Sequence, residues 1–278
     1  RKITLARAHC MPRDFSTVTE HPGARATSEQ RSMLFTRYHL AKLHSIDKDV
    51  LEIACGAGMG LGYLARSARS VTGGDIDETN LNVARTSYAD RPQIQLHKQN
   101  AEQLEVPDRN FDTLLLFEAI YYLANPSAFL REAQRVLRPR GVLVICSVNR
   151  QWGGFNRSPH SVQYFDADEF RCLLEQHGMT AQIYAGFPER PNSMVKWLIS
   201  LIRSFAIRWR LIPRTMSGKQ WLKRLFYGPL TTLDSEVREH MAPLEPLVEL
   251  QSGAETSQYK VLYAVGRSKN ITAGKIAA

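Results

Sequence analysis

A glycine-rich turn is the first feature of this sequence that could bind a ligand. The segment VLEIACGAGMGLGYLA places Gly56, Gly58, Gly60 and Gly62 between an apolar run and a helical pattern. Glycine lets a backbone approach a ligand closely, and the first turn of the following helix offers free N–H groups. The turn therefore predicts a site for a nucleotide-like or anionic cofactor.

A second candidate group is the carboxylate of Asp75, in GGDID after the next predicted strand. An acid at that strand end can accept both hydroxyls of a ribose. The following helix needs an N-cap, and Asp77 suits that role better than Asp75. The dinucleotide fingerprint GxGxxG fits poorly, because Leu61 stands where its third glycine would be, and the sequence has no GxxxxGK[ST] phosphate loop.

The elements that must position these groups alternate between strand and helix patterns. Strands are expected at 49–54, 70–75, 93–98, 112–117, 141–148, 180–186 and 259–266, and helices at 28–45, 59–68, 78–88, 127–137 and 167–177. This alternation predicts an α/β fold, with a doubly wound, seven-stranded, mostly parallel, Rossmann-like sheet. About seventy residues between the last two strands exceed a hairpin loop and predict a helical insertion.

Several segments together resemble the class I S-adenosylmethionine-dependent methyltransferase family. They are VLEIACGAGMG, VTGGDID, QNAEQLEVPDRNFDTLLLFEAIYYL and FLREAQRVLRPRGVLVICSVN. The resemblance implies S-adenosylmethionine as the cofactor and S-adenosylhomocysteine as its product. It implies a methyltransferase core over 46–187 and 258–267, a cofactor-covering arm and helix over 1–45, and a basic insertion over 188–257 that serves as a lid or substrate site.

The resemblance also assigns cofactor contacts to residues at the ends of four predicted strands. The methionine end would meet Glu52, Ala54, Gly56 and Gly58; the ribose, Asp75; the adenine, Ile76, Asn100, Ala101 and Glu102; and the methyl donor, Phe117 and Glu118. Asn100 departs from the family pattern, which commonly has an acid at that position.

The implied chemistry is in-line attack on an activated methyl group, and a hydroxyl acceptor would need a base. Candidate catalytic residues are His160 in the loop after the fifth strand, His39 on the first helix, and Tyr121, which with Tyr122 could orient the acceptor. Each has an ordinary structural alternative. A lone loop histidine commonly lies at the surface, Tyr38 and His39 could pack the first helix, and the tyrosine pair could only line a pocket.

Absent motifs narrow the reaction further. No Asn/Asp-Pro-Pro-Tyr or Pro-Cys follows the fourth strand, which disfavours amide-nitrogen and cytosine-carbon methylation, and no paired acids mark a magnesium site. The four cysteines form no CxxC pair and no zinc-type cluster with histidine, so no metal site is predicted. Reduced thiols in a cytoplasmic protein are the simplest interpretation.

A strongly basic segment lies outside the predicted methyltransferase core. Nine basic and no acidic residues lie between Arg190 and Leu233, which equals the net charge of +9 for the whole chain. Within it, residues 194–212 have a wide apolar face, a cationic stripe and tryptophan, which suits a membrane interface. Packing over the substrate pocket or against a second subunit explains the pattern equally well. Nucleic acid is the less favoured partner, because the aromatic residues belong to the apolar face.

The sequence thus predicts transfer of a methyl group to a small-molecule acceptor, at an oxygen of a sugar, glycolipid or natural product. An anionic or lipid-linked acceptor would suit the basic insertion, with the protein in the cytoplasm or peripherally at the membrane. Two alternatives stay open: a tRNA or protein methyltransferase that uses the insertion, and a non-catalytic cofactor-binding regulatory protein. Homo-oligomerisation is also open.

Asp75→Ala tests the ribose assignment. Loss of hydrogen bonds to a charged group is expected to weaken binding of S-adenosylmethionine by about 1.5–3 kcal/mol. Calorimetric titration gives the affinity, and thermal unfolding should show that the variant still folds. An unchanged affinity in the folded variant would remove Asp75 from the ribose site.

Overall fold

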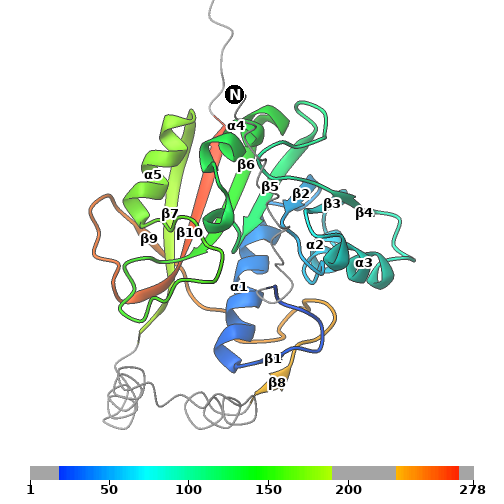
Figure 1. The fold of residues 1–278 in the computed structure, drawn as a ribbon, viewed down its shortest axis with the longest axis horizontal. Helices are drawn as coiled ribbons and strands as arrows, with labels where there is room; N and C mark the ends of the chain where they lie inside the picture. The colour runs from blue at the N-terminus through cyan, green and yellow to red at the C-terminus, as the bar shows by residue number, and fades with distance from the viewer. Residues whose placement is uncertain (1–18, 190–229, 269–278) are drawn as a thin grey trace, which may run out of the picture.

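A buried sheet forms the centre of the computed structural model of this chain, which describes residues 19–189 and 230–268. The strand order is β4-β3-β2-β5-β6-β10-β7-β9 (Figure 1). The strands are β1 (Arg25–Ala26), β2 (Asp49–Ile53), β3 (Ser70–Asp75), β4 (Ile94–Lys98), β5 (Phe111–Phe117), β6 (Leu137–Val148), β7 (Met179–Pro188), β8 (Thr231–Thr232), β9 (Val248–Leu250) and β10 (Tyr259–Ser268). The helices are α1 (Ser28–Leu43), α2 (Leu61–Ala65), α3 (Glu78–Ser87), η1 (Ile120–Tyr122), α4 (Pro126–Val136) and α5 (Ala167–Gln176).

The five strands β4, β3, β2, β5 and β6 are parallel to one another. The next strand, β10, lies antiparallel between β6 and β7. Val50 to Ile53 of β2 are all buried, as expected for a parallel strand covered on both faces. The predicted α/β, mostly parallel Rossmann-like sheet is confirmed. The described residues add an eighth strand, β9, which pairs with β7. Its three residues are too few to give a sequence pattern.

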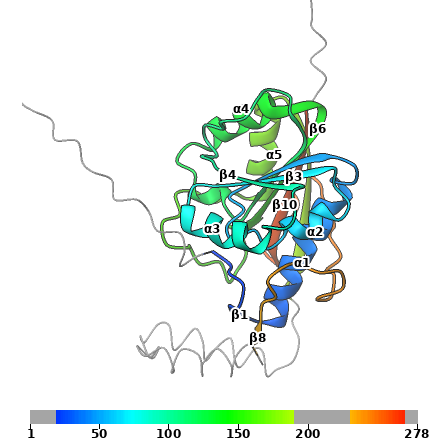
Figure 2. The ribbon, with the colours of Figure 1, turned by 90° about the vertical axis from the view of Figure 1, so that its right-hand side faces the viewer.

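Helices cover both faces of the sheet, and each face has its own apolar cluster. Leu34 of α1, Leu64 of α2 and Leu81 of α3 belong to one cluster, while Phe129 of α4 and Phe170 of α5 belong to the other. Figure 2 shows α4 and α5 on one side of the sheet and α1 and α2 on the opposite side. The doubly wound arrangement follows from these two separate cores.

Capping side chains fix where three of the helices begin. Thr27 and Gln30 form a reciprocal capping box at α1, and Asp166 and Glu169 form another at α5. The Asp77 side chain accepts a hydrogen bond from the backbone at the start of α3. The predicted N-cap at Asp77 is therefore confirmed.

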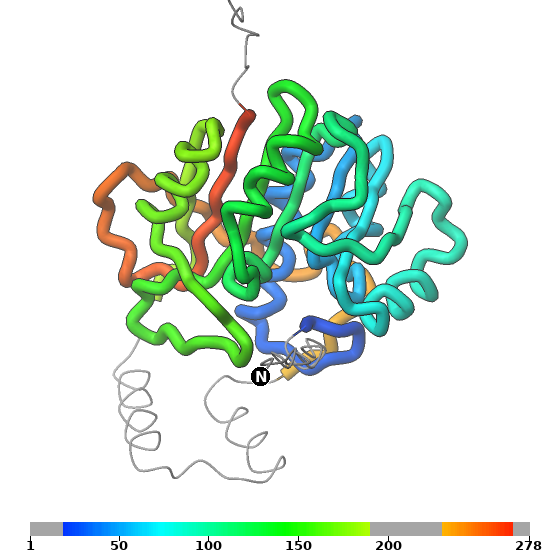
Figure 3. Tube along the Cα trace, turned by 45° about the horizontal axis from the view of Figure 1, so that its top comes forward, coloured from blue at the N-terminus to red at the C-terminus, as the bar shows by residue number. Residues whose placement is uncertain are grey.

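The chain that follows residue 230 returns across α1 toward α2 (Figure 3). Its β8 pairs with β1, the Val237 N–H donates to the carbonyl of Met59 at 2.8 Å, and Glu239 accepts from Lys42 at 2.7 Å and from Tyr63 at 3.0 Å. Residues 194–212 and most of the predicted basic insertion lie outside the described residues, so their role stays a prediction. Among the described residues, no helix is long and apolar enough to cross a membrane.

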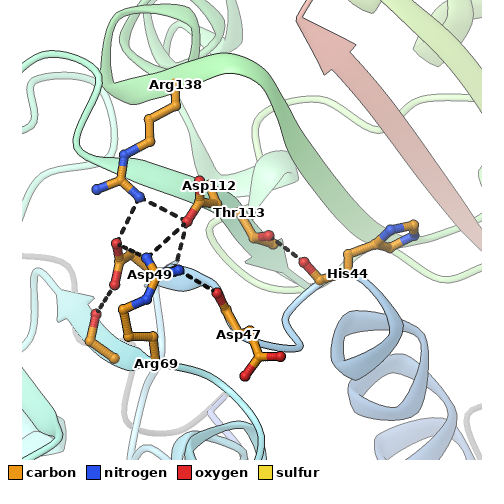
Figure 4. Close-up of polar contacts among 8 residues, drawn as sticks. His44, Asp47, Asp49, Arg69, Asp112, Thr113 and Arg138 are labelled. Atoms are coloured by element: carbon orange, nitrogen blue, oxygen red, sulfur yellow. Dashed lines mark hydrogen bonds and ion pairs between the residues drawn. The ribbon is translucent and has the colours of Figure 1, made fainter.

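An ion-pair network links the strands at the end of the sheet where β2 and β5 begin (Figure 4). Arg138 donates to Asp49 at 2.7 Å and to Asp112 at 2.8 Å, and Arg69 donates to Asp49 at 2.9 Å. Burial alone would raise the pKa of Asp49, but hydrogen bonds from Arg138 and Ser70 and the charge of Arg69 lower it below its ordinary value. The two aspartates therefore depend on arginine to remain charged at close range.

Arg138→Met is expected to lower the free energy of unfolding by about 1–2 kcal/mol at pH 7, because it leaves two half-buried carboxylates facing each other. The folded-state pKa of Asp49 is depressed, so this stabilisation is complete above the ordinary value of 3.8 and is lost as the pH falls below it. Urea unfolding at pH 7 and pH 3 measures the difference from wild type, which should shrink in acid.

Arg131→Met is the matched control, because Arg131 is exposed on α4. Its effect should stay within about 0.5 kcal/mol at both pH values. Equal losses in the two variants, or a loss at Arg138 that persists in acid, would contradict the role given to the network.

Candidate functional site

A cavity of about 1270 Å³ opens where β2, β3 and β5 end. Glu52, Asp75 and Phe117 line it from these three strands, and α1 lines it with Met33 and Arg37. Ligands of open α/β sheets bind outside the carboxyl ends of the strands. Pockets of about 300–1,000 Å³ hold one drug-sized ligand. The cavity therefore has room for a cofactor and an acceptor together.

Most of the residues predicted to contact the cofactor line this cavity. They are Glu52, Ala54, Gly56, Asp75, Ile76, Asn100, Ala101, Glu102, Phe117 and Glu118. Gly58 does not line it. A Cβ on Gly58 would lie 2.9 Å from the Cβ of Ala84 in α3, so this glycine allows close packing between the loop and that helix.

The three predicted catalytic residues lie in different surroundings. Tyr121 lines the cavity, whereas His39 and His160 are not among its lining residues. His39 lies 3.8 Å from the carboxylate of Glu239 and packs beside Phe35. His160 is exposed in a turn, with a φ of 66°. The catalytic roles suggested for His39 and His160 therefore stay predictions.

The glycine loop is shaped by what covers it. Gly56 has a φ of 55°, and a Cβ there would lie 2.6 Å from the methyl carbon of Thr19. A Cβ on Gly60 would lie 1.8 Å from the ring of Tyr38. Any larger residue at either position would push the covering segment or α1 off the loop. The glycines therefore let Thr19 and Tyr38 close over the cavity.

Glu52 presents an unsatisfied carboxylate oxygen in the cavity wall. Its side chain is 1% exposed, its Oε1 accepts a 2.6 Å hydrogen bond from the Tyr38 hydroxyl, and its Oε2 has no hydrogen-bond partner. Burial raises the pKa of Glu52 to about 7, although the Tyr38 hydrogen bond and the charge of Arg37 oppose the rise. A buried carboxylate oxygen without a partner attracts a cation. The ammonium of a bound amino acid fits this position.

Asp75 holds the glycine loop as well as facing the cavity. Its Oδ2 accepts from the Gly56 N–H at 2.7 Å and its Oδ1 from the Asp77 N–H at 2.8 Å. Burial raises the pKa of Asp75, and these backbone hydrogen bonds oppose the rise. The neighbouring Ile76 is 53% exposed, an unusual state for a large apolar side chain in a cavity wall. A ribose at Asp75 and an adenine ring on Ile76 fit this arrangement.

A strained acid follows β5. Glu118 has a φ of 50°, in the left-handed region that a residue with a Cβ rarely adopts. It accepts a 3.0 Å hydrogen bond from the Tyr121 hydroxyl and a 3.5 Å contact from the Cys146 thiol. Burial raises the pKa of Glu118, while the charge of Arg37 opposes the rise. The strained backbone points the carboxylate into the cavity, where it can meet a reacting group.

Sequence reasoning missed the charged residues that line the cavity from α1, β10 and the segment before β1. Arg37 pairs with Glu20, and Lys260 pairs with Glu29 at 2.6 Å and lies over the ring of Trp152. The spacing from Met33 to Arg37 is one helical turn, which could have placed Arg37 on the cavity face of α1. Glu20 and Lys260 carried no such signal.

Comparison with known proteins agrees with this geometry. The sequence matches a family model described as a methyltransferase domain over residues 51–145. A fatty-acid O-methyltransferase from Mycolicibacterium smegmatis is 35% identical, over 73% of this chain and 70% of that protein. A Mycobacterium tuberculosis protein named a probable S-adenosylmethionine-dependent methyltransferase is 32% identical, over 52% of this chain and 53% of that protein. The chain thus spans about half the length of the latter relative.

Solved structures share the fold at low sequence identity. The crystal structure of a SAM-dependent methyltransferase from Thermotoga maritima has a TM-score of 0.54, with 17% identity over 86% of this chain and 90% of that chain. At this identity the match supports the sheet order and the helix layers alone.

If Glu52 binds the ammonium of the cofactor, binding should depend on pH. An ammonium binds the ionised carboxylate, so with a pKa of about 7 the affinity for S-adenosylhomocysteine should fall as the pH drops below 7. The expected slope approaches about tenfold per pH unit. Calorimetric titration between pH 6 and 8 measures it.

Two variants make this test specific. Glu52→Gln should bind weakly at pH 8 and lose the pH dependence, whereas Tyr38→Phe should move the midpoint upward, because the Tyr38 hydrogen bond lowers the pKa of Glu52. Glu239→Gln changes an acid outside the cavity lining and should leave the curve in place. A wild-type affinity that does not vary over this range would exclude Glu52 as the ammonium ligand.

Proposed function

This chain belongs to the class I S-adenosylmethionine-dependent methyltransferase family, and on that premise we propose that it methylates an oxygen atom of a small, largely apolar acceptor. Among the acceptors suggested by the sequence, a sugar, a glycolipid or a natural product, the cavity favours one with an apolar part. The protein would act in the cytoplasm, and peripherally at a membrane if residues 194–212 bind lipid.

Apolar side chains in the cavity lining are the observation that carries this proposal. The cavity is lined by Met33, Tyr122, Val148, Trp152 and Val261, and the ion pair of Lys260 with Glu29 lies beside Trp152. Burying an apolar chain against such a wall contributes about 25 cal/mol per Å² of surface removed from water. A sugar alone would leave most of its hydroxyls without partners there.

The bound cofactor supplies a methyl group on a sulfonium, which needs no further activation. Glu52, Asp75 and Ile76 would hold its ammonium, ribose and adenine, and these contacts fix the depth at which the methyl group lies. Glu118, directly after β5, and Tyr121 of η1 also line the cavity.

Alignment is the main contribution of the protein to such a reaction. Holding the acceptor oxygen in line with the methyl carbon can supply about 7–11 kcal/mol. The Tyr121 hydroxyl, which donates to Glu118 at 3.0 Å, would contact the acceptor oxygen. Glu118 would also accept the proton of a hydroxyl acceptor, because its pKa is raised by burial.

The substrate profile of the relatives supports an oxygen acceptor. The M. smegmatis relative is named for methylation of a fatty-acid oxygen, and it aligns with most of this chain. The apolar wall described above is consistent with an acceptor of comparable character.

Methyl transfer from labelled S-adenosylmethionine, followed by mass spectrometry of the product, tests the proposal. With an amphiphilic acceptor panel that includes decanoate and decan-1-ol, a product carrying one new O-methyl group is expected. Glu118→Gln and Tyr121→Phe should each lower kcat by about tenfold or more, with little change in cofactor affinity.

Tyr63→Phe is the matched control for Tyr121→Phe. Its hydroxyl also donates to a glutamate, Glu239, but it lies outside the cavity lining. A kcat equal to wild type is expected. If the wild-type chain binds no S-adenosylhomocysteine and transfers no methyl group to any acceptor of the panel, the proposed function fails.

A further inference from the structure

A buried arginine in the cavity wall is not used by the cofactor contacts. Arg37 is 8% exposed and lines the cavity from α1. Guanidinium remains charged at any physiological pH, so a buried one requires an anion beside it. Its anion is the carboxylate of Glu20, which contacts Nη2. The Nε atom of Arg37 is buried and has no hydrogen-bond partner.

The two members of this pair are held very differently. Arg37 is fixed by α1, whereas the side chain of Glu20 is 41% exposed and belongs to the segment before β1. That segment is attached by the pairing of Arg25 and Ala26 with β8 and by Thr19, which accepts a hydrogen bond from Asn80 at 3.5 Å. A rotation of the exposed Glu20 side chain can therefore free Arg37 without unfolding the sheet, whereas α1 fixes the backbone of Arg37.

Glu20 also satisfies Arg37 incompletely. Arginine binds a carboxylate best through two parallel N–H···O bonds, and Nε with Nη2 forms one such edge. Glu20 uses Nη2 and leaves Nε unpaired. A free carboxylate that enters the cavity would compete with Glu20 for Nη2. Because Nε is buried, the same carboxylate would bind it only after the guanidinium shifts toward the cavity.

The position of Arg37 suits an acceptor head group. Its charge acts on the pKa of Glu118, so it lies near the end of β5 where the methyl donor would be. Met33, one helical turn earlier on α1, also lines the cavity and offers an apolar surface next to Arg37. Glu118 is the competing anion, and burial raises its pKa, which reduces its competition for the guanidinium.

Resting on the proposed function, we propose that Arg37 binds the carboxylate of an apolar-tailed monocarboxylic acid as the methyl acceptor, and that Glu20 occupies this place until the acceptor arrives. Arg37 is then the residue that determines specificity for the acceptor head group, and Glu20 is an internal substitute for the acceptor.

The reaction at this head group balances without a base. A carboxylate oxygen attacks the methyl carbon, the carbon–sulfur bond breaks, and its electron pair remains on sulfur. The products are a methyl ester and S-adenosylhomocysteine, and no proton is released. This agrees with the cavity lining of the described residues, which contains no histidine.

Loss of charge also favours product release. The carboxylate is negative before the transfer, and the ester is neutral afterwards, so Arg37 loses its partner at the moment of reaction. A buried guanidinium without an anion is costly. Return of Glu20 restores the pair and displaces the ester.

The test measures binding to the full chain in complex with S-adenosylhomocysteine, using decanoate, decan-1-ol and methyl decanoate as probes. Wild type should bind decanoate at least tenfold more tightly than the two neutral probes. Glu20→Gln removes the internal competitor and should tighten decanoate binding severalfold without changing decan-1-ol binding. Arg37→Met should abolish the preference for decanoate.

A second ion pair on α1 provides matched controls. Lys42 and Glu239 form a 2.7 Å pair outside the cavity lining, so Lys42→Met and Glu239→Gln should leave the preference for decanoate unchanged. Binding of S-adenosylhomocysteine by each variant shows that it is folded. If the cofactor product binds but decanoate and decan-1-ol bind wild type equally, or Glu20→Gln changes neither, the carboxylate proposal is overturned while methyl transfer stands. If S-adenosylhomocysteine does not bind, the proposed function itself has failed.

Discussion

The hydrogen bond from the Gly56 amide to the Asp75 carboxylate is the contact on which the rest of the site depends. It joins the turn after β2 to the end of β3, so these neighbouring strands are also linked beyond the sheet. Gly56 makes this bond with a φ of 55°, and Ala54 and Gly58 in the same turn also have positive φ. The cavity is therefore built by the sheet order together with a left-handed turn.

The loop is also held from outside the sheet. Tyr38 of α1 packs where only Gly60 leaves room and donates to Glu52, while the chain after residue 230 bonds to Met59 through the Val237 amide. Segments from both ends of the chain thus converge on one turn. A ligand that orders either segment would also order the loop, because the contacts are shared.

The sequence predicted those features that depend on interactions between residues close together in the chain. The strands of the core, the cap at Asp77 and the glycine turn follow from apolar runs, side-chain hydrogen bonds and residue size, and the structure agrees. β9 was missed, because its pairing with β7 comes from distant chain rather than from its own three residues. Arg37 and Glu20 were missed for the same reason: seventeen positions separate them, and only the fold makes them partners.

A buried ion pair needs a physical reason to be present. Replacing a buried ion pair with packed apolar side chains is often neutral or stabilising, so the Arg37–Glu20 pair is weak as an argument for stability. The Asp49–Arg138–Asp112 network differs, since it lies away from the cavity lining and all its partners satisfy one another. Arg37 lines the cavity with a guanidinium whose Nε is buried and has no hydrogen-bond partner. A charge that is fixed, incompletely paired and part of a cavity wall is better explained by an exchangeable ligand than by folding.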